Sequence, residues 1–327
     1  MKNHAKLICR LILLMAFFYA SFAYAENTPD SLYRNAQALF NKGQYVKAIK
    51  EYDRILSLGA DLTLLHQVYI YRGLSYQKIG RLDKALEDYT MASKINYPPE
   101  PTQAYFSLGI IHILRHEYDK AIIQYDKILS MKPDSNALYQ AHVARGSSYQ
   151  AMGRLDKALE DFTKASKINN RPNPAYVYFL IGSIYYTRGS YGRAFDYYDQ
   201  AIIMKADQTL LSQINLHRGI YYEVKGPLPK AVDAYTEAIR VQPNDPSLYF
   251  TRANLKKRML QYDQAIADYT RAIQLSPDDP LLYACRAHVQ IVNGHQRDAH
   301  EDLRKACAMG EAKSCRVYNF LMSRNRF

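Results

Sequence analysis

Residues 81–96 have the sequence RLDKALEDYTMASKIN, and residues 154–169 repeat it with only two changes. The two copies lie 73 residues apart, so the chain contains an internal duplication. Within the first copy, Ala85, Tyr89 and Ala92 follow one another at spacings of four and three residues, which places them on one face of a helix. The stretch therefore predicts a helix that buries a face made of small and aromatic residues.

This pattern extends beyond the two near-identical copies to eight copies. An aligned alanine recurs at intervals of 34 to 37 residues: Ala48, Ala85, Ala121, Ala158, Ala194, Ala231, Ala265 and Ala299. Four residues later come Tyr52, Tyr89, Tyr125, Phe162, Tyr198, Tyr235, Tyr269 and, in the last copy, Leu303. Twelve residues before each alanine stands a small residue: Ala36, Gly73, Gly109, Gly146, Gly182, Gly219, Ala253 or Ala287. A small residue allows close helix approach, so each copy is predicted to be a pair of helices.

Glycine and proline mark the ends of these helices. Between the two helices of a copy we expect a left-handed residue that ends the first helix, at Gly43, Gly80, Gly153, Gly189, Gly226 and Gly294. Pro133, Pro243 and Pro277 are expected to stop the second helix.

The order of small residue, turn glycine, alanine, ring and proline resembles the tetratricopeptide repeat. The resemblance implies an all-α, right-handed superhelical solenoid over residues 26–311, because a single helix pair cannot bury its apolar face. The eight repeats are expected near 29–62, 66–99, 102–135, 139–172, 175–208, 212–245, 246–279 and 280–311, with a C-terminal capping helix at 312–327. The first five intervals exceed the 34 residues of the family, and the extra residues are expected along one edge of the stack.

Residues 1–25 are predicted to be a signal peptide. Basic residues precede an apolar run that starts at Leu11, and Ala23 and Ala25 offer a cleavage site before Glu26. The run of about 15 residues is shorter than the roughly 20 that span a bilayer, which favours cleavage over the alternative of an uncleaved anchor. We therefore expect a bacterial protein that is periplasmic or secreted.

Composition is that of a packed protein, with 48% hydrophobic and 23% charged residues and a formal net charge of +12. The basic run of Arg252, Lys256, Lys257 and Arg258 is interpreted as a solvated helix face, with a docking patch for an acidic partner as the alternative. Because an exported chain without a reader motif is no candidate for nucleic-acid binding, we expect no nucleic-acid partner.

The inner surface implied by the resemblance is formed by the first helix of each repeat, near its small residue. The candidates for a peptide groove are Tyr33, Gln67, Ile70, Gln103, Phe106, Ile110, Gln140, Tyr176, Phe179, Gln213, Phe250 and Asn254. Rings could grip a peptide there, and glutamine amides could pair with its backbone. The alternative, that a given residue is packed core between repeats, stays open. Some relatives bind the terminal carboxylate of a peptide with basic and amide side chains at these positions. In this chain the matching positions are mostly apolar or neutral, so we expect no such carboxylate-binding site.

Three cysteines follow the predicted leader. Cys307 and Cys315 flank a turn and are expected to form a disulfide in an oxidising compartment, a pairing that resembles those of secreted relatives of this repeat family. Two free thiols are the alternative. Cys285 is then left as a buried thiol.

No constellation for catalysis is evident. His112 and His116 have the spacing that can place two imidazoles on one helix face, but Glu117 follows them instead of lying between them, so a zinc-peptidase site is not expected. Nucleophile elbows and phosphate loops are absent from the sequence, and we expect no metal, no cofactor and no enzymatic activity.

The sequence thus predicts a non-enzymatic scaffold or adaptor in the bacterial cell envelope. Its partner would be a protein or peptide that the sequence does not identify, and membrane contact is not required. The alternative is an accessory regulatory subunit of a periplasmic enzyme of envelope assembly. Self-association through an exposed edge of the stack also stays open.

Overall fold

The computed structural model describes residues 28–95, 102–169 and 172–323. These residues form seventeen α-helices and no strand, which confirms the prediction of an all-α helical repeat solenoid. The predicted leader at residues 1–25 lies outside the described residues, as does the end of the expected cap beyond residue 323.

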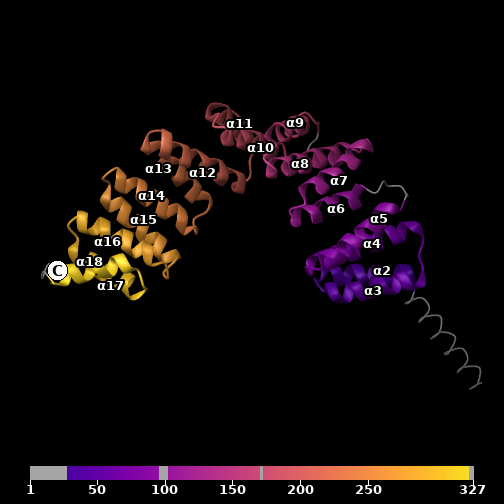
Figure 1. Ribbon diagram of the computed structural model, residues 1–327, viewed down its shortest axis with the longest axis horizontal. Helices are drawn as coiled ribbons and strands as arrows, with labels where there is room; N and C mark the ends of the chain where they lie inside the picture. The colour runs from indigo at the N-terminus through magenta and orange to yellow at the C-terminus, as the bar shows by residue number, and fades with distance from the viewer. Residues whose placement is uncertain (1–27, 96–101, 170–171, 324–327) are drawn as a thin grey trace, which may run out of the picture. The chain divides into compact units, whose positions relative to one another are not determined.

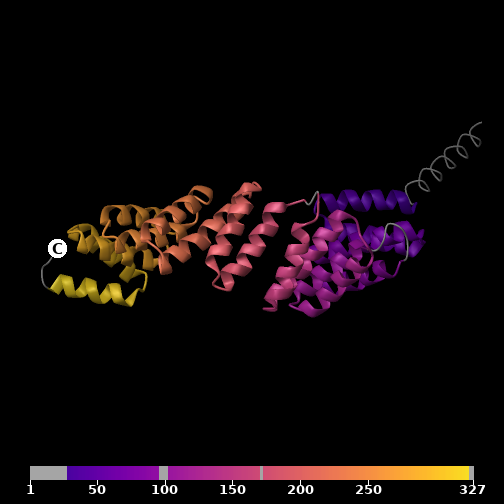
Figure 2. The same ribbon diagram turned by 90° about the horizontal axis from the view of Figure 1, so that it is seen from above.

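Successive helices form antiparallel pairs within two compact units, one ending at Pro172 and the other starting at Asn173 (Figures 1 and 2). In the first unit the pairs are α2 (Pro29–Asn41) with α3 (Tyr45–Leu58), α4 (Leu62–Lys78) with α5 (Leu82–Lys94), α6 (Thr102–Leu114) with α7 (Tyr118–Ser130), and α8 (Ser135–Ala151) with α9 (Leu155–Ser166). In the second unit they are α10 (Pro174–Thr187) with α11 (Tyr191–Ile203), α12 (Gln208–Lys225) with α13 (Leu228–Val241), α14 (Pro246–Arg258) with α15 (Tyr262–Leu275), and α16 (Pro280–Val292) with α17 (Gln296–Ala308). The helix α18 (Ala312–Ser323) follows α17.

The core consists of the residues that recur in the sequence. All eight aligned alanines are fully buried, and the seven rings and Leu303 that follow them are buried as well. In each middle repeat the ring lies against the glycine of the first helix: a Cβ atom added at Gly146 would lie 2.6 Å from the Phe162 ring, and one at Gly109 would lie 2.6 Å from Tyr125. The small residue is therefore required by the ring that covers it.

After the first, third and fifth repeats, the extra residues of the sequence lengthen the first helix of the next repeat. The helices α4, α8 and α12 have 17, 17 and 18 residues, whereas α6 has 13. Each long helix begins after an aspartate whose carboxylate accepts a backbone N–H: Asp61 from Leu64, Asp134 from Ala137 and Asp207 from Leu210. These N-caps set the helix starts four residues before the repeat boundaries predicted near 66, 139 and 212.

The turn inside each repeat is left-handed at five of the six predicted glycines: Gly43, Gly80, Gly153, Gly189 and Gly294. The prediction is wrong at Gly226, which has φ −120° because α12 continues to Lys225 and Pro227 then starts an extended cap. In two other repeats, His116 and Leu260 adopt the left-handed conformation with φ 58° and 60°.

The hydroxyl groups of the buried tyrosines differ in their partners, and this gives a first prediction. Tyr89 donates to Gln77 Oε1 at 3.0 Å, whereas the Tyr125 hydroxyl has no hydrogen-bond partner among the described residues, because Ile113 takes the place of Gln77. Replacing Tyr125 with Phe should raise the free energy of unfolding by up to about 1 kcal/mol, and Tyr89→Phe should lower it by about 1 kcal/mol. Urea denaturation of both variants measures this, and equal losses would contradict it.

Candidate functional site

A groove of about 830 Å³ lies on α6 and α8 in the first unit. It is lined by Thr102, Gln103, Phe106, Ser107, Ile110, Lys132, Pro133, Asp134, Ala137 and Gln140. Four of the predicted groove residues, Gln103, Phe106, Ile110 and Gln140, therefore meet in one place. This groove is the candidate site.

The apolar surface of the groove comes from α6. Phe106 and Ile110 lie one helical turn apart, so they share a face of the helix. The Phe106 ring is half-buried against Tyr125, with ring centroids 6.0 Å apart, and the Ile110 side chain is 44% exposed. Such a surface can accept an apolar side chain from a ligand.

Polar groups surround this apolar surface. Gln103 on α6 and Gln140 on α8 are both exposed, and the Gln140 amide donates to Asn136 Oδ1 at 3.3 Å. The loop before α8 contributes Lys132, in a left-handed conformation, and Asp134, whose carboxylate is bound by the N–H of Ala137 at 2.8 Å. The groove thus offers two side-chain amides and one ammonium group to a ligand.

The other candidates are spread over separate helices. Gln67 and Gln213 are exposed, and Tyr176 is half-buried. Tyr33 is half-buried, and burial and the nearby Tyr71 raise its pKa to about 12, so its hydroxyl is neutral near pH 7. Phe250 has the same position in its repeat as Phe106 and lines a small pocket of about 160 Å³.

Three predicted groove residues make contacts within the stack of helices instead. Ile70 is 1% exposed and Phe179 is 8% exposed, so neither can reach a ligand. Phe179 stacks on Tyr198 at 5.7 Å and on His217 at 6.0 Å between ring centroids. Asn254 accepts the hydroxyl hydrogen of Tyr269 at 2.7 Å. For Ile70 and Phe179 the alternative interpretation, packed core between helices, therefore holds.

A series of ion pairs with buried aspartates recurs in the repeats and was not predicted from the sequence. Arg145, just before the small residue of its repeat, donates to both carboxylate oxygens of Asp161, just before the ring, at 2.7 and 2.8 Å. It also bonds Asp126 of the preceding repeat. The same bidentate pair joins Arg72 to Asp88, Arg252 to Asp268 and Arg286 to Asp302. The signal in the sequence is the constant separation of 16 residues between arginine and aspartate.

Most of the cations in the basic run on α14 are paired with carboxylates of this chain. Arg252 and Lys256 both bond the buried carboxylate of Asp268, at 2.6 and 2.8 Å, and their side chains are 14% and 12% exposed. Arg258 lies 3.4 Å from Glu223. The interpretation of this run as a solvated face is therefore wrong for Arg252 and Lys256, because both side chains are partly buried and paired with Asp268.

His112 and His116, which have the spacing of metal ligands in the sequence, do not share a helix face. His112 is buried in α6 with Nδ1 2.7 Å from Glu117 Oε2, and this hydrogen bond lowers the pKa of Glu117. His116 lies in the left-handed turn after α6 has ended at Leu114. Within residues 28–95, 102–169 and 172–323, no three or more His, Cys, Asp or Glu side chains are grouped to hold a metal ion. None of the helices described in these ranges has the length and apolar content of a membrane span.

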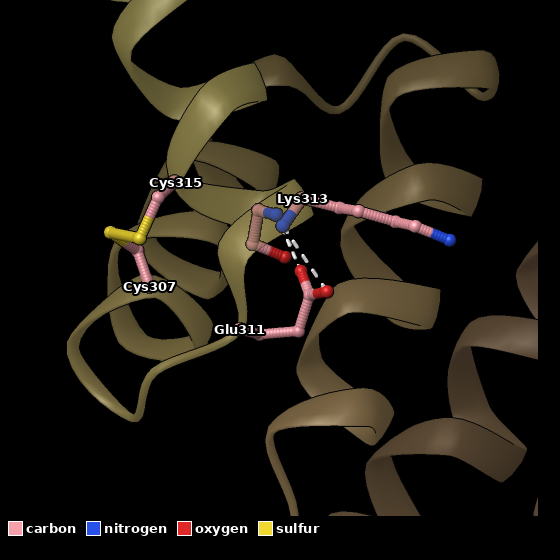
Figure 3. The surroundings of a disulfide bond; sticks show 5 residues. Cys307, Glu311, Lys313 and Cys315 are labelled. Atoms are coloured by element: carbon pink, nitrogen blue, oxygen red, sulfur yellow. Dashed lines mark hydrogen bonds between the residues drawn. A yellow bond between two sulfur atoms is a disulfide. The ribbon is translucent and has the colours of Figure 1, made fainter.

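A disulfide joins the last repeat to α18. Cys307 in α17 and Cys315 in α18 are bonded, with their Cα atoms 4.5 Å apart (Figure 3). Glu311 caps α18 by accepting the backbone N–H groups of Lys313 and Ser314. Cys285 is a half-buried free thiol, and burial raises its pKa, so it is protonated near pH 7.

Models of known families match three parts of the chain. Two models described as tetratricopeptide repeat match residues 72–136 and 138–205, and one described as TPR repeat matches residues 261–294.

Curated relatives are distant and longer than this chain. The human protein O-mannosyl-transferase TMTC1 is 26% identical over 53% of this chain, which spans 19% of that protein. The human mitochondrial import receptor subunit TOM70 is 24% identical over 65% of this chain, which spans 36% of that protein. The crystal structure of a tetratricopeptide repeat protein from Parabacteroides merdae is 22% identical, covers 79% of this chain and 99% of its own, and superposes with a TM-score of 0.51. These likenesses support a shared fold.

Proposed function

Because this chain belongs to the tetratricopeptide repeat family, we propose that its groove on α6 and α8 binds a peptide segment of a partner protein. The fold of this family is typically a non-catalytic scaffold for protein–protein interaction. The observation that carries the proposal is the meeting of Phe106 and Ile110 with two exposed glutamines in one groove.

The groove favours an extended segment with one apolar anchor. An apolar side chain on Phe106 and Ile110 would be removed from water, which is worth roughly 1.5–3 kcal/mol for a residue the size of Leu. The amides of Gln103 and Gln140 can each donate to and accept from a peptide backbone, so they can satisfy groups that binding removes from water.

We further propose that the scaffold works in the bacterial cell envelope. Two features support export: the leader-like residues 1–25, and the disulfide between Cys307 and Cys315, a bond that persists in oxidising compartments. The mass of the protein from a periplasmic extract tests this. A chain that starts at Glu26 is expected, and an intact leader on cytosolic protein would overturn it.

The groove itself is tested with a binding peptide and two matched variants. Peptides are selected on the protein from a phage-displayed random library, and the affinity of the best synthetic peptide is measured by fluorescence anisotropy. Ile110→Glu places a charge on the apolar surface and should weaken binding about tenfold or more. Ile123→Glu makes the same change on α7, at a side chain that is 52% exposed outside the groove, and should leave the affinity unchanged. Equal affinities for both variants, with unchanged thermal melting, would refute the proposed site.

A further inference from the structure

A second pocket, of about 410 Å³, lies on α16 beside α18 in the second unit. It is lined by Lys257, Leu281, Ala284, Cys285, His288, Ile291, Leu303, Glu311, Lys313, Ser314 and Val317. We infer that this pocket binds an acidic peptide segment, with one apolar side chain in the pocket and acidic side chains on Lys257 and Lys313. The site is distinct from the α6–α8 groove in its residues, its charge and its unit.

The charge of the pocket favours acidic ligands. Lys257 comes from α14, the first helix of the preceding repeat, and Lys313 comes from α18, the helix that follows α17. Neither ammonium group has an ion-pair partner among the described side chains. The Lys313 side chain extends away from the disulfide (Figure 3). Glu311 is the one carboxylate in the lining, and its oxygens already accept the N–H groups that start α18. Two unpaired cations therefore face the ligand.

The floor of the pocket is apolar. It is made mainly by α16, where Leu281, Ala284, Cys285 and Ile291 line the space, and Val317 of α18 adds a wall. Leu281 and Val317 are exposed, so an apolar side chain in the pocket would cover apolar surface that now faces water. This combination selects an apolar residue with acidic neighbours over a purely acidic or purely apolar segment.

The wall formed by α18 depends on the disulfide. Of the side chains of α18, only Ser314 is buried, and Tyr318 and Leu321 pack partly against α16 and α17. Such a small buried face holds a helix weakly, so the bond between Cys307 and Cys315 fixes the position of Lys313 and Val317. Reduction should therefore weaken binding at this pocket and leave the α6–α8 groove unaffected.

Cys285 provides a local readout, because its thiol lines the pocket. The rate of Cys285 alkylation by iodoacetamide is measured on the chain that starts at Glu26, in the presence of blocked dodecapeptides. One peptide has a central Leu between glutamates, a second replaces the Leu with Ala, and a third replaces the glutamates with lysines. We expect only the first peptide to protect Cys285 from alkylation, and we expect this protection to decrease as salt is added. Equal protection by the lysine peptide, or binding of the first peptide without protection, would overturn the inference.

Charge reversal identifies the cations. Lys257→Glu with Lys313→Glu should weaken binding of the acidic peptide about tenfold or more. Lys47→Glu with Lys50→Glu, at exposed positions of α3, changes the net charge equally and should have no such effect. If the Lys257→Glu, Lys313→Glu variant has a lowered melting temperature, Leu281→Ser is used instead. Leu281 is exposed in the apolar floor of the pocket, so this change should also weaken binding of the acidic peptide. Unchanged affinity in the folded pocket variants would refute the site, whatever the result for the α6–α8 groove.

Discussion

Replacing Asp161 with Ala is expected to lower the free energy of unfolding of the first unit by about 3–5 kcal/mol. The Asp161 carboxylate is buried and accepts two hydrogen bonds from Arg145, at 2.7 and 2.8 Å, and His142 Nδ1 lies 2.9 Å from it. Its removal leaves the guanidinium group without its main partner in a half-buried site. The exposed Asp126 remains, but the buried side of the guanidinium group loses its hydrogen-bond acceptor, and this loss costs more than the loss of the attraction itself.

The second carboxylate on the same arginine is the control. Asp126 also bonds Arg145, but its side chain is 49% exposed, so Asp126→Ala should lower the free energy of unfolding by no more than about 1 kcal/mol. Urea denaturation, with hydrogen exchange in α8 and α9 as a local probe, separates the two variants. Similar losses for both would show that burial does not set the strength of this pair.

The same pair predicts a dependence on acid. Burial alone would raise the pKa of Asp161, but hydrogen bonds from Arg145 and His142 outweigh burial and lower the pKa below its usual 3.8. A carboxyl group with a lowered pKa stabilises the fold fully above its unfolded pKa, and this contribution is lost as pH falls toward the folded pKa. Below about pH 4 the wild-type unit should lose stability more steeply than Asp161→Ala.

Replacing Tyr198 with Ala should lower the free energy of unfolding of the second unit by about 3–5 kcal/mol. The ring is fully buried against Gly182, where an added Cβ would lie 2.6 Å from it, and it stacks on Phe179. Its hydroxyl lies 2.6 Å from His217 Nδ1, so the residue joins α11 to both α10 and α12. Alanine would leave a cavity where all three helices meet.

Tyr198→Phe separates the ring from the hydroxyl. It keeps the packing and removes the hydrogen bond, so the loss should be about 1–2 kcal/mol. Urea denaturation of both variants, followed by circular dichroism, measures the difference. If the two losses were equal, the hydroxyl and not the packing of the ring would dominate at this site.

The helix pairs could be predicted because their signals are local. The spacing of Ala158 and Phe162 on one helix and the glycine at 146 on the other describe contacts inside one repeat. The helix starts at α4, α8 and α12 were missed because an aspartate N-cap, not the apolar pattern, sets them. Arginine and aspartate ordinarily lie on solvated helix faces, so only the constant separation of 16 residues marks the Arg145–Asp161 pair in the sequence.

The groove could be predicted only in part, because exposure depends on the neighbouring helix. Phe106 and Phe179 have the same position in their repeats. Phe179 is covered by the His217 ring of α12, whereas Phe106 faces a groove whose opposite side is formed by Ala137 and Gln140 of α8. A pattern within one repeat cannot distinguish these two surroundings.

The near-identity of α5 and α9 makes their partners interchangeable. The two stretches differ only in Tyr89, which is Phe162 in the second copy, and in Met91, which is Lys164 there and, like it, is exposed. The preceding helices α4 and α8 present a glycine and an arginine at matching positions. An exchange of these helices between two molecules would keep the contacts that each makes with the glycine and the arginine of the first helix. The three-residue connections at 79–81 and 152–154 oppose it by tying each helix to its own neighbour. Lengthening either connection would therefore favour domain-swapped dimers over monomers.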